Sequence, residues 1–455
     1  MSDLLRIAVV GHTNTGKTSL LRTLAHDPGF GEISDRAGTT RHVEGLRLLA
    51  AGEPVAELFD TPGMEDAIAL LERFDGLARA GERIDGPERV ARFLALPEAA
   101  GRFEQEAKVL RRLLASDAGL YVIDARDPVL PKHRDELAIL SACARPLLPV
   151  LNFTAAGDAR SDAWRTALAR LNLHAVVSFD TVAPPVDGER RLFEALATLV
   201  QTHRAVLDRL IEAREHEAET RRAAARRVAA ELLVTLAATR HLVASDSQAA
   251  LDTAVMHLRE SVRERERHAI DTLLRLYRFG ADDARTADLP LVEGRWEDDL
   301  FHPGTLRRMG VKVGTGAAAG AAAGVGIDLV TGGLTLGAAA AIGALAGGLW
   351  QTFGHYGERL AARLRGHREL TLDDAVLRLV ALRQQLLLDA LEGRGHAAVE
   401  PIRIEDPDVR RWRDGPLPEA IERARAHPEW TDALRPDPER EAAVQALLRE
   451  WGGAA

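Results

Sequence analysis

A short motif near the N-terminus constrains the fold of this chain more than any other feature. The apolar run LRIAVV, residues 5–10, leads directly into GHTNTGKTSL. The second segment matches G-x-x-x-x-G-K-S/T, with Gly11, Gly16, Lys17 and Thr18 in the required positions. A loop of this kind, between a buried strand and a helix, turns successive N–H groups toward phosphate oxygens. The flanking strand and helix patterns favour this interpretation over a merely glycine-rich turn.

The same region predicts a site for a nucleoside triphosphate and Mg²⁺. Lys17 is expected to reach the β- and γ-phosphates, and the Thr18 hydroxyl to ligate the metal. A hairpin pattern ending in VAELF leads into DTPG, residues 60–63. Proteins with this loop hold the water shell of Mg²⁺ with an acidic residue at the end of a buried strand, so Asp60 is the candidate. The Gly63 N–H is expected to contact the γ-phosphate.

Together these residues resemble the Era/TrmE-type branch of the P-loop GTPases. The resemblance covers about residues 4–200, less than half of the chain. It implies an α/β fold with a doubly wound, mostly parallel sheet, and it implies hydrolysis of GTP with Mg²⁺. The helical patterns that follow predict a mainly α-helical C-terminal region.

The resemblance also assigns roles to single residues. Residues 11–19 form the phosphate loop, which adds Asn14, Thr15 and Ser19 to those already named. In AGTTRHVEG, Thr40 is the expected switch I threonine that binds Mg²⁺ and the γ-phosphate, in preference to its neighbour Thr39. The expected catalytic residues are therefore Lys17, Thr40 and Gly63.

The residue after DTPG departs from the pattern of many GTPases. Met64 stands where they place a glutamine that orients the attacking water, and a thioether cannot do this. The resemblance therefore implies another source of positive charge. In potassium-activated relatives an asparagine at the position of Asn14 helps to coordinate K⁺, although asparagine is also a common turn residue. Arg36 and Arg41 are either arginine fingers or solvated charges of the switch loop.

The stretch LNFTAAGD, residues 151–158, stands where these GTPases carry the base-reading motif N-K-x-D. Asn152 is kept, whereas Phe153 and Ala155 replace the lysine and the aspartate. Phe153 is expected to cover one face of the base by stacking. Ala155 has no group that can pair with a base.

A substitute carboxylate has two candidates. VVSFDT, in the later part of the base pocket, contains Ser178 as a pocket residue and Asp180 close behind it. Either Asp180 or Asp158 is the candidate to replace the lost aspartate. Guanine specificity is thus implied by the resemblance and not by the motif, since the loss of a paired polar group costs specificity heavily.

Sequence periodicity predicts four regions. Residues 1–205 form the GTPase domain, with a helical insertion of two apparent helices at about 65–116. Residues 206–306 form a helical domain, 307–368 a Gly/Ala-rich helical hairpin, and 369–455 a helical C-terminal region.

Apolar stripes at helical spacing support these assignments. Their members are Phe103, Ala107, Leu110 and Leu114 in the insertion, and Leu251, Val255, Leu258, Val262, Ala269, Leu273 and Leu276 farther on. A capping pattern of Thr371 and Asp374 marks the start of a later helix, with Gly393 as its end. The insertion either transmits the nucleotide state from switch II or is a packed addition.

The Gly/Ala-rich segment 310–350 contains only two charges, Lys312 and Asp328, and its glycines recur every four residues. This spacing lets helices approach closely in membranes, and Leu329–Trp350 is long enough to cross a bilayer core, which needs about 20 residues. Basic flanks would keep both ends in the cytosol. A buried hairpin in a soluble core is the alternative, and Asp328 is expected at the bend in either setting.

The composition limits the partners and the compartment. Residues are 46% hydrophobic and 28% charged, which excludes a disordered chain. A formal net charge of −9 disfavours nucleic acid as a partner. The single cysteine, Cys143, cannot form an internal disulfide, and the N-terminus lacks a signal-peptide pattern. A cytoplasmic protein is expected, either free or at the inner face of the cytoplasmic membrane.

We therefore expect a molecular switch that hydrolyses GTP with Mg²⁺, with K⁺ as a candidate activator. Its helical region would contact a membrane or an unidentified protein effector. A dynamin-like membrane-remodelling or tethering protein is one alternative. An RNA- or ribosome-assembly GTPase is another, which the acidic charge balance disfavours.

Overall fold

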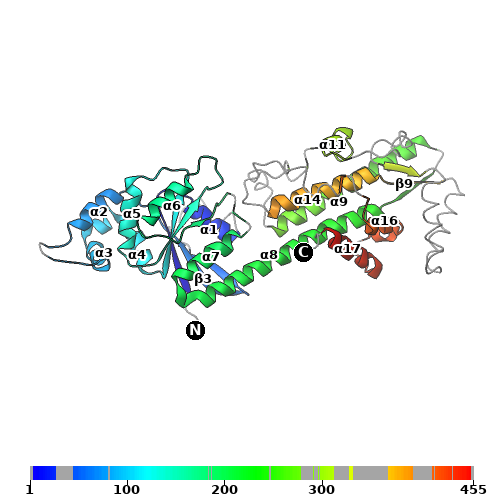
Figure 1. Ribbon diagram of the computed structural model, residues 1–455. Coiled ribbons are helices and arrows are strands. Elements are labelled where there is room, and N and C mark those ends of the chain that lie inside the picture. The colour runs from blue at the N-terminus through cyan, green and yellow to red at the C-terminus, as the bar shows by residue number, and fades with distance from the viewer. Residues whose placement is uncertain are drawn as a thin grey trace. The chain divides into compact units, whose positions relative to one another are not determined.

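The chain divides into two compact units in a computed structural model (Figure 1). One unit comprises Met1–Thr220 with Glu392–Ala398, and the other comprises Arg221–Leu391 with Val399–Ala455. The residues described are 4–26, 45–79, 82–182, 184–185, 187–244, 247–277, 291, 296, 298–311, 327–330, 367–392, 412–413, 416–432 and 434–451.

The first unit is built on a six-stranded sheet in the order β2-β3-β1-β4-β5-β6. Its strands are β1 (Leu5–Val10), β2 (Gly45–Ala50), β3 (Glu53–Asp60), β4 (Ala118–Asp124), β5 (Leu147–Asn152) and β6 (Val177–Ser178). Within this sheet β2 and β3 pair antiparallel, and the other neighbouring pairs are parallel. The predicted α/β fold with a mostly parallel sheet is confirmed.

Parallel pairing aligns the carboxyl ends of the central strands. Val9 of β1 lies opposite Asp60 of β3, and Asp124 of β4 lies opposite Asn152 of β5. Every residue of β4 and β5 is buried, as expected for parallel strands that are covered on both faces. The loops after β1, β3 and β5 therefore leave the sheet at one edge, where open α/β sheets bind their ligands.

Helices cover both faces of this sheet (Figure 1). One face packs against α1 (Lys17–Ala25), α7 (Gly188–Leu199) and the start of α8 (Arg204–Ala238). The other packs against α2 (Ala67–Asp75), α3 (Gly86–Leu94), α4 (Glu104–Leu114), α5 (Pro131–Ser141) and α6 (Ser161–Ala169). Two 3₁₀ helices, η1 (Pro97–Ala100) and η2 (Gln201–His203), complete the described elements of this unit.

The predicted insertion contains three α-helices among its described residues, and not two. The additional helix is α3. It begins after Asp85 because the Asp85 side chain caps it, accepting a hydrogen bond from Glu88 N at 2.8 Å, and because a proline stands in its first turn. The apolar stripe is confirmed: Phe103, Ala107 and Leu110 are buried, and Leu114 is partly buried against them.

The second unit is mainly helical, as predicted. Its described helices beyond α8 are α9 (Gln248–Leu276), α11 (Pro303–Arg308), α14 (Asp374–Glu392), α16 (Glu419–Ala424), the 3₁₀ helix η4 (Pro428–Thr431) and α17 (Pro438–Trp451). The predicted stripe from Leu251 to Leu276 falls on α9, and its residues through Leu273 are buried while Leu276 is partly buried. The division into four regions stays a prediction.

A three-stranded antiparallel sheet in this unit was not predicted. Its strands are β7 (His241–Ala244), β8 (Ile327–Val330) and β9 (His367–Leu372), in the order β7-β9-β8. Asp328, expected at the bend of a helical hairpin, instead pairs with Thr371 in this sheet. The prediction of a helix from Leu329 onward is also wrong for residues 329 and 330, which belong to β8. Strands of four to six residues paired across long sequence separations leave a weak local signal, and the Gly/Ala pattern around β8 favoured helix.

The start of α14 also differs from the prediction. Asp373 and not Thr371 caps this helix, since Asp373 Oδ1 accepts a hydrogen bond from Ala375 N at 2.8 Å. Thr371 belongs to β9. The helix ends at Glu392, and the predicted stop at Gly393 lies outside the described residues.

Most of the Gly/Ala-rich segment 310–350 lies outside the described residues, so the hairpin stays a prediction for that part. Within the residues that the structure describes, no helix combines the length and the apolar character that a bilayer crossing requires.

A buried ion pair joins two helices of the second unit. Arg383 of α14 lies 3.2 Å from Glu266 of α9, and both side chains are almost fully buried. Burial raises the pKa of Glu266, and Arg383 opposes that rise. Arg383 also donates a hydrogen bond to the carbonyl oxygen of Asp298.

Removal of one partner from this pair is expected to destabilise the protein by about 3–5 kcal/mol, because it leaves a buried charge without compensation. Glu266→Ala should therefore lower the free energy of unfolding strongly in urea denaturation followed by circular dichroism. Glu260→Ala, on an exposed side chain of the same helix that pairs with Arg263 and Arg267, is the matched control and should change it by about 0–1 kcal/mol. Equal effects of the two substitutions would contradict this account.

Candidate nucleotide-binding site

The phosphate loop connects β1 to α1, and Lys17 begins that helix. Lys17 Nζ lies 3.2 Å from Gly11 O and 2.7 Å from His12 O, to both of which it donates hydrogen bonds. Burial lowers the pKa of Lys17, while the nearby carboxylates of Asp60 and Glu136 oppose the shift. The ammonium is thus held against the loop backbone at the start of the helix.

Two positions of the loop require glycine, because atoms from other parts of the sheet lie too close for a Cβ there. Gly16 has a φ of 89°, and a Cβ there would lie 2.2 Å from Asn152 Nδ2. Gly11 has a φ of 145°, and its Cβ would lie 2.5 Å from Val122 O. Asn14 also has a positive φ, 66°, which fits its interpretation as a turn residue. Nothing in the backbone geometry tests its role as a K⁺ ligand.

Thr18 and Asp60 have the donor set and geometry that fit Mg²⁺. Thr18 Oγ1 donates a hydrogen bond to Asp60 Oδ2 at 2.6 Å, which brings the two predicted metal residues together. The other oxygen, Asp60 Oδ1, is buried and has no hydrogen-bond partner among the described residues. A buried carboxylate oxygen without a partner is costly, and a hydrated hard cation is a suitable partner for it.

Switch II begins in direct contact with the phosphate loop. A Cβ at Gly63 would lie 2.2 Å from Thr13 Oγ1 and 2.7 Å from Thr13 N, so only glycine allows this approach. Met64 N donates to Gly11 O at 3.4 Å. The Met64 side chain is fully buried in the apolar core with residues of α2 and α4.

Asn152 links the phosphate loop to both base loops. Its Nδ2 donates to Thr15 O at 3.0 Å, and its Oδ1 accepts from Phe153 N and Thr181 N, each at 2.9 Å. The Phe153 ring reaches the phosphate loop, since a Cβ at Gly16 would meet Phe153 Cζ at 3.2 Å.

Asp180 and Asp158 differ sharply in their surroundings. Asp180 is buried, and its carboxylate accepts hydrogen bonds from Ala155 N at 2.8 Å and Val182 N at 2.9 Å. It therefore ties Ala155, in the loop after β5, to Val182, in the loop after β6. Asp158 is exposed. Ser178 lies at the end of β6, where its Oγ accepts a hydrogen bond from Arg165 Nη2 at 2.9 Å.

Four predicted residues of switch I lie outside the described residues: Arg36, Thr39, Thr40 and Arg41. The predicted Mg²⁺ ligand Thr40 and the two arginine-finger candidates therefore stay predictions. Thr15 and Ser19 stand in the loop and helix as expected from their positions, and Thr15 Oγ1 donates to His12 O at 3.1 Å.

A polar cluster behind the phosphate loop was missed by the sequence analysis. His12 Nδ1 lies 2.7 Å from Glu136 Oε1, and Tyr121 donates its hydroxyl hydrogen to Glu136 Oε2 at 2.7 Å. Lys132 Nζ lies 2.9 Å from His12 Nε2. Burial raises the pKa of Glu136, and hydrogen bonds from Tyr121 and His12 oppose that rise. The clue that could have pointed to this cluster is Glu136, a charged residue that lies among the buried apolar residues of α5.

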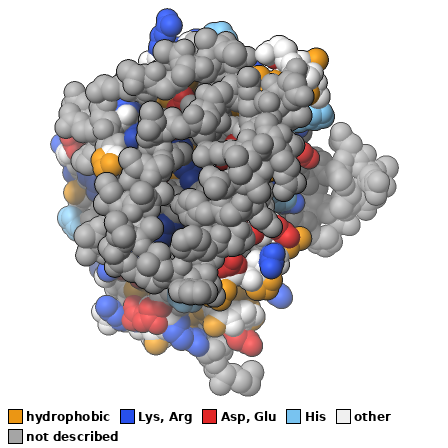
Figure 2. All heavy atoms as spheres, turned by 90° about the vertical axis from the view of Figure 1, so that its right-hand side faces the viewer, with side chains coloured by type: hydrophobic (Ala, Val, Ile, Leu, Met, Phe, Trp, Pro, Cys, Tyr) orange, Lys and Arg blue, Asp and Glu red, His pale blue; other side chains and the backbone are white. Residues whose placement is uncertain are grey.

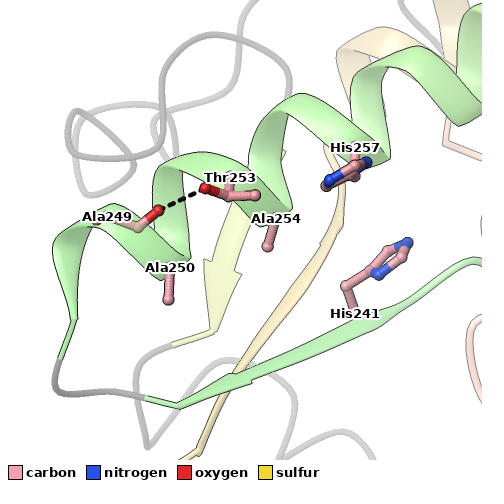
Figure 3. Close-up of a pocket in the computed structure, with 6 residues that line it drawn as sticks. All are labelled: His241, Ala249, Ala250, Thr253, Ala254 and His257. Atoms are coloured by element: carbon pink, nitrogen blue, oxygen red, sulfur yellow. Dashed lines mark hydrogen bonds between the residues drawn. The ribbon is translucent and has the colours of Figure 1, made fainter.

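A separate hollow of about 530 Å³ lies in the second unit (Figure 3). It is lined by His241 of β7 and by residues of α9: Ala249, Ala250, Thr253, Ala254 and His257. The Thr253 hydroxyl is already engaged, since it donates to Ala249 O at 2.8 Å. Within the described residues no group of three or more histidine, cysteine or acidic side chains could hold a metal ion. On the face seen in Figure 2, basic and acidic side chains of described residues lie beside one another.

Comparison with solved structures finds similar chains at low sequence identity. Era in complex with MgGDPNP and 16S ribosomal RNA is 18% identical, with 44% of this chain and 57% of that chain covered and a TM-score of 0.30. An Aquifex aeolicus Era variant bound to GDP·AlF₄⁻ is 19% identical, with 43% and 56% covered and a TM-score of 0.29. The G domain of the T. maritima FeoB iron transporter is 16% identical, with 43% and 98% covered and a TM-score of 0.25. The chain thus spans rather more than half of the length of the two Era chains.

Family comparisons cover nearly the whole chain. No curated protein matches it. The model described as 50S ribosome-binding GTPase matches residues 6–153, which contain the phosphate loop, DTPG and Asn152. The model described as domain of unknown function DUF3482 matches residues 165–450, more than half of the chain. The chain therefore belongs to the DUF3482 family and carries a GTPase domain of the 50S ribosome-binding type in front of that region.

Proposed function

We propose that the protein is a molecular switch that binds GTP with Mg²⁺ and hydrolyses it to GDP and phosphate. The observation that carries this proposal is the Thr18–Asp60 hydrogen bond of 2.6 Å, with the second Asp60 oxygen buried and lacking a partner in the described part of the chain. Lys17, at the start of the same helix, supplies the cation that the phosphates require. The match of this segment to the GTPase family supports the same conclusion.

Hydrolysis proceeds by in-line attack of water on the γ-phosphorus. The bond from that phosphorus to the β–γ bridging oxygen breaks, GDP leaves with the electron pair, and the water loses a proton to the surrounding phosphate and solvent. Lys17 and the loop N–H groups stabilise negative charge on the β- and γ-phosphates, and the Gly63 N–H donates to the γ-phosphate. Thr18 and Thr40 would hold Mg²⁺, with Asp60 on its water shell, and the bound ion would supply positive charge to the phosphate oxygens.

A GTPase without the water-orienting glutamine needs another source of positive charge beside the phosphates. We propose two candidates for this source. Asn14 would help to hold K⁺ beside the phosphates, since its amide oxygen belongs to the phosphate loop. Arg36 or Arg41 would act as an arginine finger in the same chain. The buried Met64 side chain supports the need for such a source, because it leaves the water-orienting position without a polar group.

Guanine is the proposed base, on the strength of the family and not of the base motif. Phe153 would cover one face of the base, and Ser178 would line the later part of the pocket. Asp180 is the better placed of the two substitute carboxylates, because it already joins the two base loops through Ala155 N and Val182 N. The proposed partner of the helical region is a membrane or a protein effector. Contact with a membrane or a protein effector through residues 310–350 rests on their small-residue spacing and basic flanks.

Removal of the Lys17 ammonium should abolish triphosphate binding. A lost charge-assisted contact to phosphate lowers affinity by roughly 10- to 100-fold, and Lys17 serves two phosphates. Lys17→Ala is measured by isothermal titration with GTP, and ATP and XTP are titrated into the wild type to establish the base preference. Lys108→Ala, on an exposed lysine that pairs with Glu104, is the control and should bind like the wild type. Unchanged affinity in Lys17→Ala would refute the site.

The two interpretations of Asn14 can be separated by one substitution. Glycine keeps the positive φ of 66° but removes the amide oxygen, so Asn14→Gly should hydrolyse GTP equally fast in KCl and NaCl. The wild type should be faster in KCl. Asn172→Gly, at another asparagine with positive φ, is the control that should keep the K⁺ response. Equal wild-type rates in the two salts would end the potassium proposal.

A further inference from the structure

The residues directly after Gly63 are held by a side chain that belongs to no GTPase motif. Glu106 lies on α4, in the helical insertion, and is only 3% exposed. Its Oε1 accepts hydrogen bonds from Glu65 N and from Asp66 N, both at 3.1 Å. A buried carboxylate thus satisfies two backbone donors at the start of switch II.

The neighbouring residues make Glu106 the main anchor on this side. Asp66 precedes α2, but its side chain makes no capping hydrogen bond to that helix. Its carboxylate instead accepts from Arg102 Nη2 at 2.7 Å, and Arg102 precedes α4. The insertion therefore contacts the start of switch II through two residues four positions apart in sequence, Arg102 and Glu106.

A second anchor approaches from the phosphate loop. His12 Nδ1 lies 2.8 Å from Met64 O and 2.7 Å from Glu136 Oε1. The Lys132 ammonium can only donate, so His12 Nε2 is the acceptor in their 2.9 Å contact. Nδ1 then carries the hydrogen, which it shares between Met64 O and Glu136.

These two anchors act on the same peptide group. The carbonyl of Met64 and the N–H of Glu65 belong to one planar unit, with the carbonyl held by His12 and the N–H held by Glu106. A planar group fixed at both ends cannot rotate without breaking one of the bonds. Gly63, one residue away, packs on Thr13 so closely that no Cβ fits between them.

We propose that Glu106 is a positioning residue for GTP hydrolysis: together with His12 it fixes the Met64–Glu65 peptide and thereby aims the Gly63 N–H at the γ-phosphate. This inference rests on the proposed function of the site. It makes hydrolysis depend on the helical insertion, because the carboxylate that orients the switch comes from α4. Because the buried Met64 side chain cannot orient water, this part of switch II acts on hydrolysis through the orientation of its backbone.

The test compares Glu106→Ala and Glu106→Gln with the wild type in steady-state GTP hydrolysis. Glu106→Ala should lower kcat by roughly 10- to 100-fold, since small misplacements of positioned groups cost that much. KM and GDP affinity should stay within about 3-fold, because the phosphate loop is untouched. Glu106→Gln should recover most of the rate, since its amide oxygen accepts the same hydrogen bonds. Glu104→Ala, on the exposed Glu104–Lys108 pair of the same helix, is the control and should behave like the wild type.

Amide hydrogen exchange of the peptide covering residues 61–70 gives a readout independent of activity. Exchange should be faster in Glu106→Ala than in the wild type and near normal in Glu106→Gln. Wild-type kcat in a folded Glu106→Ala, unchanged exchange, or a glutamine variant as slow as the alanine variant would each overturn the proposal. Parallel loss of GDP affinity and melting temperature would also overturn it, as the mark of a merely structural role. A wild type that does not hydrolyse GTP would refute the proposed function, while exchange would still show whether Glu106 holds the switch.

Discussion

The parallel pairing of β1 with β3 and β4, and of β4 with β5, is the constraint on which the site depends. It places Asp60, Asp124 and Asn152 at the same end of neighbouring strands, so three loops from distant parts of the chain leave the sheet together. Strands β4 and β5 are buried along their length because both faces of the sheet are covered by helices. Each of these two strands ends in a polar residue, Asp124 or Asn152, which places polar groups at that edge.

Side chains then join these loops to one another. Thr18 meets Asp60, which connects the phosphate loop to switch II. Asn152 contacts Thr15 and Thr181, which connects the same loop to both sides of the base pocket. Asp180 accepts hydrogen bonds from Ala155 N and Val182 N and so connects the loop after β5 to the loop after β6. These contacts hold the backbone on both sides of Phe153 and Ala155, although those two residues depart from the N-K-x-D pattern.

The helical insertion has a place in this network, which favours a link to switch II over mere decoration. Its stripe of apolar residues packs it in the same core as Met64, and Glu106 holds the peptide that follows. Two contacts hold Met64 in place: its side chain packs in this core, and its carbonyl oxygen lies 2.8 Å from His12 Nδ1. The side chain cannot orient water, but its packing helps to keep the backbone of Met64 in position.

The sequence by itself determined the elements whose evidence is local. The strand, the glycine positions, Lys17 and Thr18 are contiguous, and the α9 stripe repeats at helical spacing, so both were predictable. Only the tertiary structure decided which residues meet across the chain. Glu106 lies 40 positions from the nearer of the two N–H groups that it holds, Glu136 lies 124 positions from His12, and β8 pairs with β9 across a separation similar to that of Glu106. Such contacts leave no local pattern, because a hydrogen bond or a strand pairing depends on where the fold brings its two partners and not on their neighbours in sequence.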